Sequence, residues 1–335
     1  MSGKSIRWGI VSTARIGLEK VIPGIQRSKT GIAHAIASRG LERAQEAAAK
    51  LGIEKAYGSY EELLADPEID AIYNPLPNHM HVPVTLQAVA AGKHVLCEKP
   101  VALNAVEAKQ LLDLPGDKLV AEGFMVRAHP QWIRARDIVR SGELGELKAI
   151  QTFFSYFNAD PANIRNMADI GGGALLDIGG YTMLAGRYFF EAEPQRVVSL
   201  IDRDPNFGTD RMTSALLDFG SNRHLTFTVS TQLTPYQRVQ LVGTKKRLEI
   251  AIPYNAPQGE AVQIRIDDGS LLADAGMQSQ IIAPSDQYAE LADVFGRAIT
   301  GEAPLPYGPA DAVQNMKVLD AIFASAEQGG WVSVA

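Results

Sequence analysis

The sequence predicts an α/β protein with two domains: a doubly wound parallel sheet at the N-terminus, then an α+β domain with a large, open, mostly antiparallel sheet. The chain has 335 residues, about the length of two ordinary domains. Strand-like and helix-like periods alternate in its first third, as in βαβ units. From about Leu147 onward, strand-like runs follow one another with few helices between them, which is typical of an antiparallel sheet. We expect domains at residues 1–123 and 124–335.

The elements of the first domain are predicted from the spacing of apolar residues and from β-branched content. Five strands are expected at residues 6–11, 32–38, 71–74, 94–98 and 119–123. Five helices are expected at residues 16–28, 41–51, 60–65, 82–91 and 105–112. Their alternation predicts a parallel sheet with helices on both faces.

The second domain is predicted to contain seven strands and a helical tail. The strands are expected at residues 148–157, 196–202, 213–219, 224–232, 238–244, 246–252 and 262–267. Two helices, at residues 287–299 and 311–327, are expected to close the chain. Because no flexible linker separates the domains, we expect them to pack closely with a cleft between them.

Composition excludes several classes of partner. The net charge of -6 argues against nucleic acid, which normally requires a basic face. No segment approaches the roughly 18 continuous apolar residues of a membrane span, and the start MSGKSIRW lacks the apolar core of a secretion signal. We therefore expect no membrane partner and a cytoplasmic location. The single cysteine, Cys97, excludes an intrachain disulfide and is expected to be a small buried apolar residue.

The segment WGIVSTARIG (residues 8–17) has the form of a strand that runs into a turn and a helix. In the dinucleotide fingerprint G-x-G-x-x-G, the glycines serve the tight turn, the approach of the pyrophosphate and helix packing. Here Ser12 replaces the first glycine and Ala14 the second, while Gly17 keeps the third. Such a turn also opens many α/β domains that bind nothing. The candidate cofactor contacts in it are Ser12, Thr13, Ala14, Arg15 and Ile16.

The end of the second strand indicates which dinucleotide would bind. Domains that bind NAD usually place an acidic residue there, about 20 residues after the last glycine, on the ribose hydroxyls. This chain instead has Ser38, Arg39 and Arg43. One hydroxyl and two guanidinium groups suit a 2'-phosphate, so NADP is predicted, with NAD possible. Alternatively, the two arginines are only the solvated start of a helix.

Two further strand ends contain polar candidates. In NPLPNHMH (residues 74–81), Asn78 can cap the following helix, and no third ligand joins His79 and His81, so no metal is expected. In CEKP (residues 97–100), a lysine at a strand end could bind a substrate hydroxyl beside the nicotinamide. The candidate cofactor contacts at these strand ends are Leu76, Asn78, His81, Glu98 and Lys99.

The second domain contains a glycine-rich helix entry, GGGALLDIGGY (residues 171–181). Asp177 and Tyr181 are four residues apart and are therefore expected on one helical face. In the alternative interpretation, Asp177 caps a turn and Tyr181 belongs to the core.

Seven motifs, taken in their order along nearly the whole chain, resemble the Gfo/Idh/MocA family of glucose–fructose oxidoreductases and inositol dehydrogenases. These motifs are STARIG, ASR, NPLPNHMH, CEKP, EGFMVRAHP, NIRN and GGGALLDIGGY. CEKP followed by GGG…D-x-G-x-Y is more specific than any Rossmann glycine pattern. The resemblance implies that STARIG is a Rossmann cofactor turn and that the bond before Pro100 is cis. It also implies that Lys99 touches substrate and nicotinamide ribose, that Asp177 binds the sugar, and that Tyr181 is the proton donor of the sugar-dehydrogenase and dihydrodiol-dehydrogenase branch.

The resemblance also implies cofactor contacts from Arg165 in NIRN and Tyr288 in DQYAE, and it marks Gly180 as a departure, because close relatives often have a larger residue there. The expected activity is NADP-dependent hydride transfer to or from a sugar, cyclitol or related polyol, with Lys99, Tyr181 and Asp177 as catalytic candidates. A dihydrodiol or pyranose 1-dehydrogenase, or a non-catalytic NADP sensor, remains an alternative. The exposed face of the second sheet is expected to form a homodimer or homotetramer.

Overall fold

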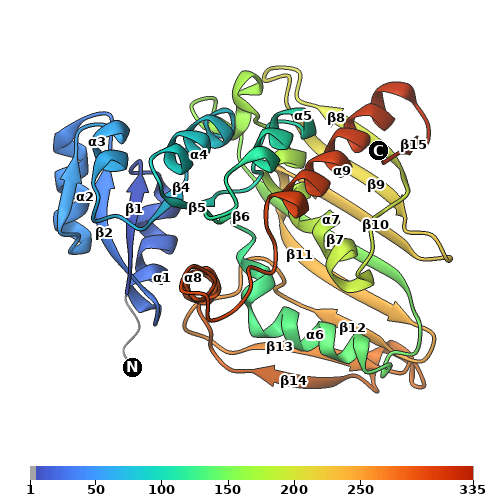
Figure 1. The fold of residues 1–335 in the computed structure, drawn as a ribbon. Helices are drawn as coiled ribbons and strands as arrows, with labels where there is room; N and C mark the ends of the chain where they lie inside the picture. Colours follow the sequence, from blue (N-terminus) through green and yellow to red (C-terminus); the bar gives the residue numbers. More distant parts are fainter. Residues whose placement is uncertain (1–4, 335) are drawn as a thin grey trace. The chain divides into compact units, whose positions relative to one another are not determined.

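The computed structural model describes residues 5–334. Two compact units make up the fold, and each contains two stretches of chain (Figure 1). The first unit extends to Ala128 and also includes Asp286–Val313, and the second unit contains His129–Ser285 and the chain from Gln314 onward.

The first unit contains a six-stranded sheet in the order β3-β2-β1-β4-β5-β6, in which every pairing is parallel. Its strands are β1 (Ile6–Val11), β2 (Gly31–Ala37), β3 (Lys55–Tyr57), β4 (Ala71–Asn74), β5 (His94–Cys97) and β6 (Val120–Glu122). The chain reverses its direction of winding beside β1, which is the switch point where doubly wound sheets bind ligands. The doubly wound prediction is confirmed. The sequence did not indicate β3, whose three partly exposed residues are too few for a periodic signal.

The helices of the first unit follow the predicted order. They are α1 (Ile22–Arg27), α2 (Leu41–Leu51), α3 (Tyr60–Ala65), α4 (His81–Ala90), α5 (Ala105–Ala108) and α8 (Gln287–Ile299). The predicted helix 16–28 contains a π turn (Gly17–Val21) before α1, and the helix predicted at 105–112 ends as a 3-10 turn (Lys109–Asp113). Side-chain caps fix two of the starts: Ser59 accepts from the Glu62 amide, and Asn104 accepts from the Glu107 amide.

Helix α8 lies in the first unit, although the sequence-based boundaries assign it to the second. The ring of Phe295 packs against Trp8 with centroids 5.6 Å apart. Asp293 Oδ1 accepts hydrogen bonds from the amides of Lys29 and Thr30 at 2.7 and 3.0 Å. The apolar face of α8 completes the core of the parallel sheet. The division at residue 123 is therefore revised, because the chain returns to its N-terminal unit after the second sheet.

The second unit is built on a nine-stranded sheet in the order β14-β13-β12-β11-β7-β10-β9-β8-β15. All its pairings are antiparallel except that of β7 with β10, which confirms the predicted type of sheet. Its strands are β7 (Leu147–Phe157), β8 (Arg196–Arg203), β9 (Asp210–Asp218), β10 (His224–Ser230), β11 (Gln232–Gly243), β12 (Arg247–Ile250), β13 (Val262–Asp267), β14 (Gln278–Ile282) and β15 (Val332–Ser333). The sequence did not indicate β14, which is largely exposed, or the two-residue β15.

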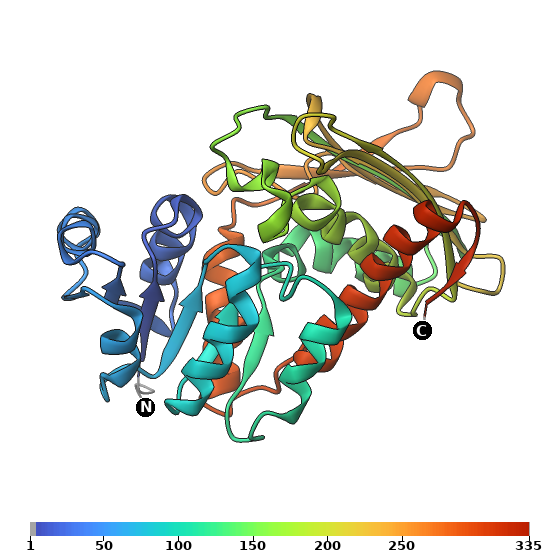
Figure 2. The same cartoon turned by 90° about the horizontal axis from the view of Figure 1, so that it is seen from above.

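Helices α7 (Gly180–Phe190) and the C-terminal part of α9 (Pro309–Gln328) cover one face of this sheet (Figure 2). Along β7 the residues alternate: Ile150 and Phe154 are buried on the helix side, whereas Gln151 is exposed on the other. Helix α6 (Pro130–Arg140) was not predicted, and its Trp132 is fully buried and donates from Nε1 to the Pro253 carbonyl. Within the described residues, no helix is both long enough and apolar enough to cross a membrane.

Candidate functional site

The turn after β1 has the geometry that the first glycine of the fingerprint normally provides. Ser12 has a φ of 88°, in the left-handed region that L-residues rarely adopt. Its amide donates to the Ala37 carbonyl at 2.9 Å, which ties together the ends of β1 and β2. Its hydroxyl accepts from the Ala14 amide at 3.1 Å, and the first helical bond runs from Leu18 back to Ala14. A helix N-terminus therefore follows the turn directly and is suited to a pyrophosphate.

The other residues of this turn differ in their exposure. Thr13, Ala14 and Ile16 are partly exposed, whereas Arg15 is largely exposed and its Nε pairs with Glu19 at 2.8 Å. At Gly17, a Cβ atom would make only ordinary contact, 3.6 Å from the Tyr73 ring. The tight packing that the fingerprint assigns to its third glycine is therefore not required here.

The end of β2 presents the predicted hydroxyl and two guanidinium groups. Ser38 is buried, while Arg39 and Arg43 are exposed. Burial raises the pKa of the nearby Tyr60 hydroxyl, and the positive charges of Arg39 and Arg43 partly offset this rise. Both arginines thus lie near one hydroxyl group. Neither forms an ion pair in the described part of the chain, so these charges suit a phosphate dianion. No motif singled out Tyr60 beyond its expected place at the start of a helix.

The His81 ring is buried and joins two loops, and its part in cofactor binding stays a prediction. It is 1% exposed, and its ring nitrogens lie 2.7 Å from the Pro100 carbonyl and 2.6 Å from the Leu76 carbonyl. Burial lowers the pKa of His81 to about 4, so the ring is neutral at pH 7. The loops after β4 and β5 are thereby joined. Leu76 is itself buried.

Asn78 does not cap α4, contrary to the prediction. A 3-10 turn (Asn78–Met80) intervenes, α4 begins at His81, and the cap position is Met80, without a side-chain cap. The extra turn displaces Asn78 from the helix start, because the prolines before it hold the chain in an extended form.

Glu98 and Lys99 are both half-buried at the end of β5, and Glu98 lies next to two tyrosines. The peptide bond between Lys99 and Pro100 is cis, as the resemblance implied. The Tyr73 hydroxyl donates to Glu98 Oε1 at 2.8 Å, and the Glu98 amide donates to the Asn74 carbonyl. Burial, and next the charge of Glu98, raise the pKa of Tyr288. Glu98, Lys99 and Tyr288 therefore gather at the carboxyl end of the parallel sheet.

One cluster in the first unit has ligand-like spacing for a metal, formed by His34, Asp66 and Glu68. The ammonium of Lys55 donates to Asp66 Oδ2 at 2.9 Å and also to Glu68. A metal ion would have to displace this ammonium group. The cluster is therefore an ion-pair network that contains its own cation.

In the second unit, Asp177 accepts two hydrogen bonds on one oxygen. The Tyr156 hydroxyl donates to Oδ2 at 2.5 Å, and Arg165 Nε donates to the same atom at 2.9 Å. Burial and the charge of Asp177 raise the pKa of Tyr156, so the phenol keeps its proton and remains a donor. The structure thus unites two predicted residues with one that was missed. A signal existed, because Tyr156 has the same parity in β7 as the buried Phe154.

Tyr181 is 5% exposed at the start of α7. Its ring packs against Phe154 and Tyr254, with centroids 6.0 and 5.6 Å apart. Asp177 lies in a π turn (Leu175–Gly179) that precedes α7. Because a π turn spaces residues differently from an α-helix, the expected i,i+4 alignment with Tyr181 applies only loosely.

A doubly wound sheet with a turn of this kind at the end of its first strand is typical of dinucleotide-binding domains of oxidoreductases. The chain belongs to the oxidoreductase family with an NAD-binding Rossmann fold, whose model matches residues 6–120, and the GFO/IDH/MocA C-terminal domain matches residues 132–249.

Two curated relatives and one solved structure align with almost the entire chain. An uncharacterized oxidoreductase, ORF334 of Rhizobium meliloti, is 48% identical over 98% of this chain and 99% of its own. D-xylose 1-dehydrogenase (NADP(+)) 2 of Haloferax volcanii is 37% identical over 98% of this chain and 99% of its own. The structure of KijD10, a 3-ketoreductase from Actinomadura kijaniata in complex with NADP and TDP-benzene, aligns with a TM-score of 0.89 at 27% identity, over 96% of this chain and 98% of that one.

Proposed function

We propose that the protein is an NADP-dependent oxidoreductase that transfers a hydride to or from a carbon bearing a hydroxyl or carbonyl group on a sugar, cyclitol or related polyol. The main supporting observation is the pair of arginines at the end of β2, where an NAD enzyme would have a carboxylate. NADP, when bound, would supply the hydride acceptor or donor.

The residues of the first unit fit this cofactor. Backbone amides of the turn that begins at Ser12, with the helix start behind it, would bind the pyrophosphate. Ser38, Arg39 and Arg43 would bind the 2'-phosphate by charge-assisted hydrogen bonds. Tyr288 and Glu98, which lie close enough to interact electrostatically, would line the nicotinamide end.

We assign proton transfer to Tyr181, whose hydroxyl would give a proton to the substrate oxygen in reduction and take it in oxidation. The Lys99 ammonium would stabilise the negative charge that develops on the same oxygen. Asp177 would accept a hydrogen bond from a neighbouring hydroxyl group of the sugar. Its carboxylate is held in one orientation by Tyr156 and Arg165.

D-xylose is the first substrate to test, because the relative named D-xylose 1-dehydrogenase matches almost the whole chain. The experiment follows NADPH formation from NADP+ with aldopentoses, aldohexoses, cyclitols, linear polyols and a trans-dihydrodiol. Turnover of a pyranose with a lactone product would identify a pyranose 1-dehydrogenase. Turnover of the dihydrodiol alone would identify a dihydrodiol dehydrogenase. Tight NADPH binding without turnover of any member would favour a non-catalytic sensor and contradict the proposal.

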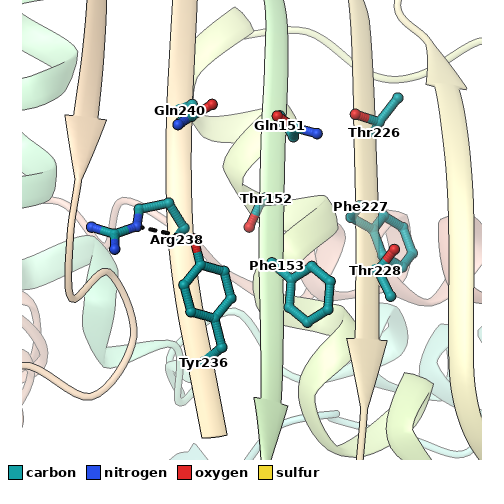
Figure 3. Close-up of a pocket in the computed structure, with 9 residues that line it drawn as sticks. All are labelled: Gln151, Thr152, Phe153, Thr226, Phe227, Thr228, Tyr236, Arg238 and Gln240. Atoms are coloured by element: carbon teal, nitrogen blue, oxygen red, sulfur yellow. Dashed lines mark hydrogen bonds between the residues drawn. The ribbon is translucent and has the colours of Figure 1, made fainter. Parts of the chain in front are cut away.

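The open face of the second sheet is the proposed surface for a homodimer or homotetramer. The paired residues Leu200, Ser214, Thr228, Phe153 and Arg238 form one row across five strands of this face. This face contains a groove of about 240 Å³, and Figure 3 shows residues that line it, among them Phe153 and Tyr236. The rings of Phe153 and Tyr236 pack edge-on, with centroids 5.4 Å apart. Leu200 is 79% exposed. Light scattering of the wild type and of Phe153→Asp tests this surface: an unchanged mass for the variant would exclude it.

A further inference from the structure

A buried carboxylate, Asp210 at the start of β9, contacts the helix entry of the second unit. Asp210 is 2% exposed. Its Oδ2 accepts from the Leu175 amide at 2.7 Å and from the Thr213 hydroxyl at 3.1 Å. Leu175 is the first residue of the π turn that contains Asp177. The carboxylate therefore satisfies an amide at the helix start that has no partner within the helix.

The glycine-rich loop leaves just enough space for this carboxylate. Gly173 has a φ of 116°, and a Cβ atom there would lie 2.0 Å from Asp210 Oδ1. The Gly173 amide donates to the Arg165 carbonyl at 2.8 Å, and the Asp177 amide donates to the Gly173 carbonyl at 3.1 Å. The loop is thus fixed between Asp210 on one side and the Arg165 backbone on the other.

These contacts connect Asp210 to the residues assigned to the reaction without placing it among them. The carboxylate contacts Leu175 and Gly173, and this segment leads directly into Asp177 and then into Tyr181. Displacement of the segment would move the Asp177 carboxylate and the Tyr181 hydroxyl together. Because a shift of about 1 Å in a catalytic group can cost roughly 10² in rate, such a displacement would be measurable.

We infer that Asp210 is a positioning residue that sets the place of Asp177 and Tyr181 by anchoring the glycine-rich loop and the helix start. The inference rests on the proposed function, which assigns Asp177 and Tyr181 to the reaction. Nothing in the motifs of the sequence distinguishes Asp210 from a surface aspartate at the start of a strand.

The test uses the full-length protein with Asp210→Leu, Asp210→Asn and Gly173→Ala, and Thr213→Val as the matched control. Leucine fills the space without an acceptor, asparagine keeps an acceptor oxygen, and the added methyl group of Gly173→Ala would collide with the carboxylate. Thr213→Val removes the other partner of the carboxylate but leaves the Leu175 bond. For each protein, kcat and KM for D-xylose, the Kd of NADPH and hydrogen exchange of residues 171–184 are measured.

We expect Asp210→Leu and Gly173→Ala to lower kcat about 10²-fold, to raise KM, and to speed exchange at residues 171–184, with an unchanged Kd for NADPH. Asp210→Asn should restore most of kcat, and Thr213→Val should stay within about twofold of wild type. A loss of active protein alone would lower kcat without any change in KM and without rescue by asparagine, and that pattern would overturn the inference.

Hydrogen exchange separates this inference from the proposed function. If D-xylose and the other substrates are not turned over by the wild type, the proposed function fails, but the exchange comparison still reports whether Asp210 anchors the segment. If Asp210→Leu does not fold, Gly173→Ala and Asp210→Asn provide the same comparison. Unchanged exchange and unchanged kinetics in Gly173→Ala would contradict the anchor.

Discussion

Tyr156 donates its phenolic hydrogen to Asp177, and the recipient oxygen is the one that also accepts from Arg165. The carboxylate is thereby held in one orientation by donors from β7 and from a 3-10 turn (Ile164–Asn166). An aspartate that binds sugar hydroxyls benefits from such restraint, because less rotational freedom is lost when the substrate binds.

Tyr156→Phe should therefore weaken substrate binding. A hydrogen bond to a charged group contributes about 1.5–3 kcal/mol, and about 1.4 kcal/mol corresponds to a tenfold change. We expect KM for the sugar to rise about tenfold, with a smaller change in kcat and no change in the Kd of NADPH. Steady-state kinetics measure this, with Tyr236→Phe on the opposite face of the sheet as control. An unchanged KM would mean that Asp177 does not bind the substrate.

Arg39→Asp should weaken NADP binding selectively, since it replaces one guanidinium at the end of β2 by the carboxylate that NAD enzymes use. We expect the Kd of NADPH to rise by about 10² while the Kd of NADH stays the same or falls. Fluorescence titration with both cofactors measures the change, and Lys50→Ala at the far end of α2 is the control. Tighter binding of NADH than NADPH by the wild type would refute the premise.

Two glycines of the first unit should respond oppositely to alanine. At Gly17 a Cβ would make only ordinary contact, whereas at Gly24 it would lie 2.6 Å from Tyr288 Cβ. Alanine is favoured over glycine in a helix by about 0.8–1.0 kcal/mol. Gly17→Ala should therefore raise the unfolding free energy slightly, and Gly24→Ala should lower it by about 1–3 kcal/mol. Urea unfolding measures both free energies. Equal changes in the two variants would contradict the close packing of Gly24 against Tyr288.

Lys99 and Tyr181 should act as a unit on the substrate oxygen. Proton transfer by a positioned side chain contributes about 10² to 10⁴ in rate, so Tyr181→Phe should lower kcat within this range while the Kd of NADPH barely changes. Lys99→Ala should be at least as harmful, and the double variant should lose much less than the product of the single losses. Losses that multiply would indicate separate roles, and full activity of Tyr181→Phe would exclude it as the donor.

Asp210 should make stability depend on pH in a recognisable window. Burial raises the pKa of Asp210 from 3.8 to about 6 in the folded protein, despite its bonds to Leu175 and Thr213 and the charge of Arg203. The folded state then binds more protons than the unfolded state between these values. Its stability contribution is complete below about pH 4 and is lost as the pH rises through 6.

Asp210→Asn does not titrate, so its unfolding free energy relative to wild type should increase by about 2 kcal/mol between pH 4 and pH 7. Urea unfolding of both proteins across this range measures the difference. Comparison with the variant removes the opposite contribution of His81, which is present in both. A constant difference would mean that the folded pKa of Asp210 is not raised.

The sequence determined the features that depend on residues close together in the chain. Apolar periodicity fixed most strands of both sheets, because burial of one strand or helix face leaves a local pattern. The turn at Ser12 and the strand end at Lys99 were recognisable for the same reason, since their chemistry lies within a few consecutive residues.

The tertiary structure decided which distant segments meet. Helix α8 has an amphipathic pattern that does not reveal which sheet it covers, and only contacts such as Phe295 with Trp8 assign it to the first unit. Likewise, the bond from Tyr156 to Asp177 and the bond from Leu175 to Asp210 join residues 21 and 35 positions apart. Such pairs leave no local pattern, because a buried polar group needs only a partner of suitable geometry, and the fold can bring that partner from any part of the chain.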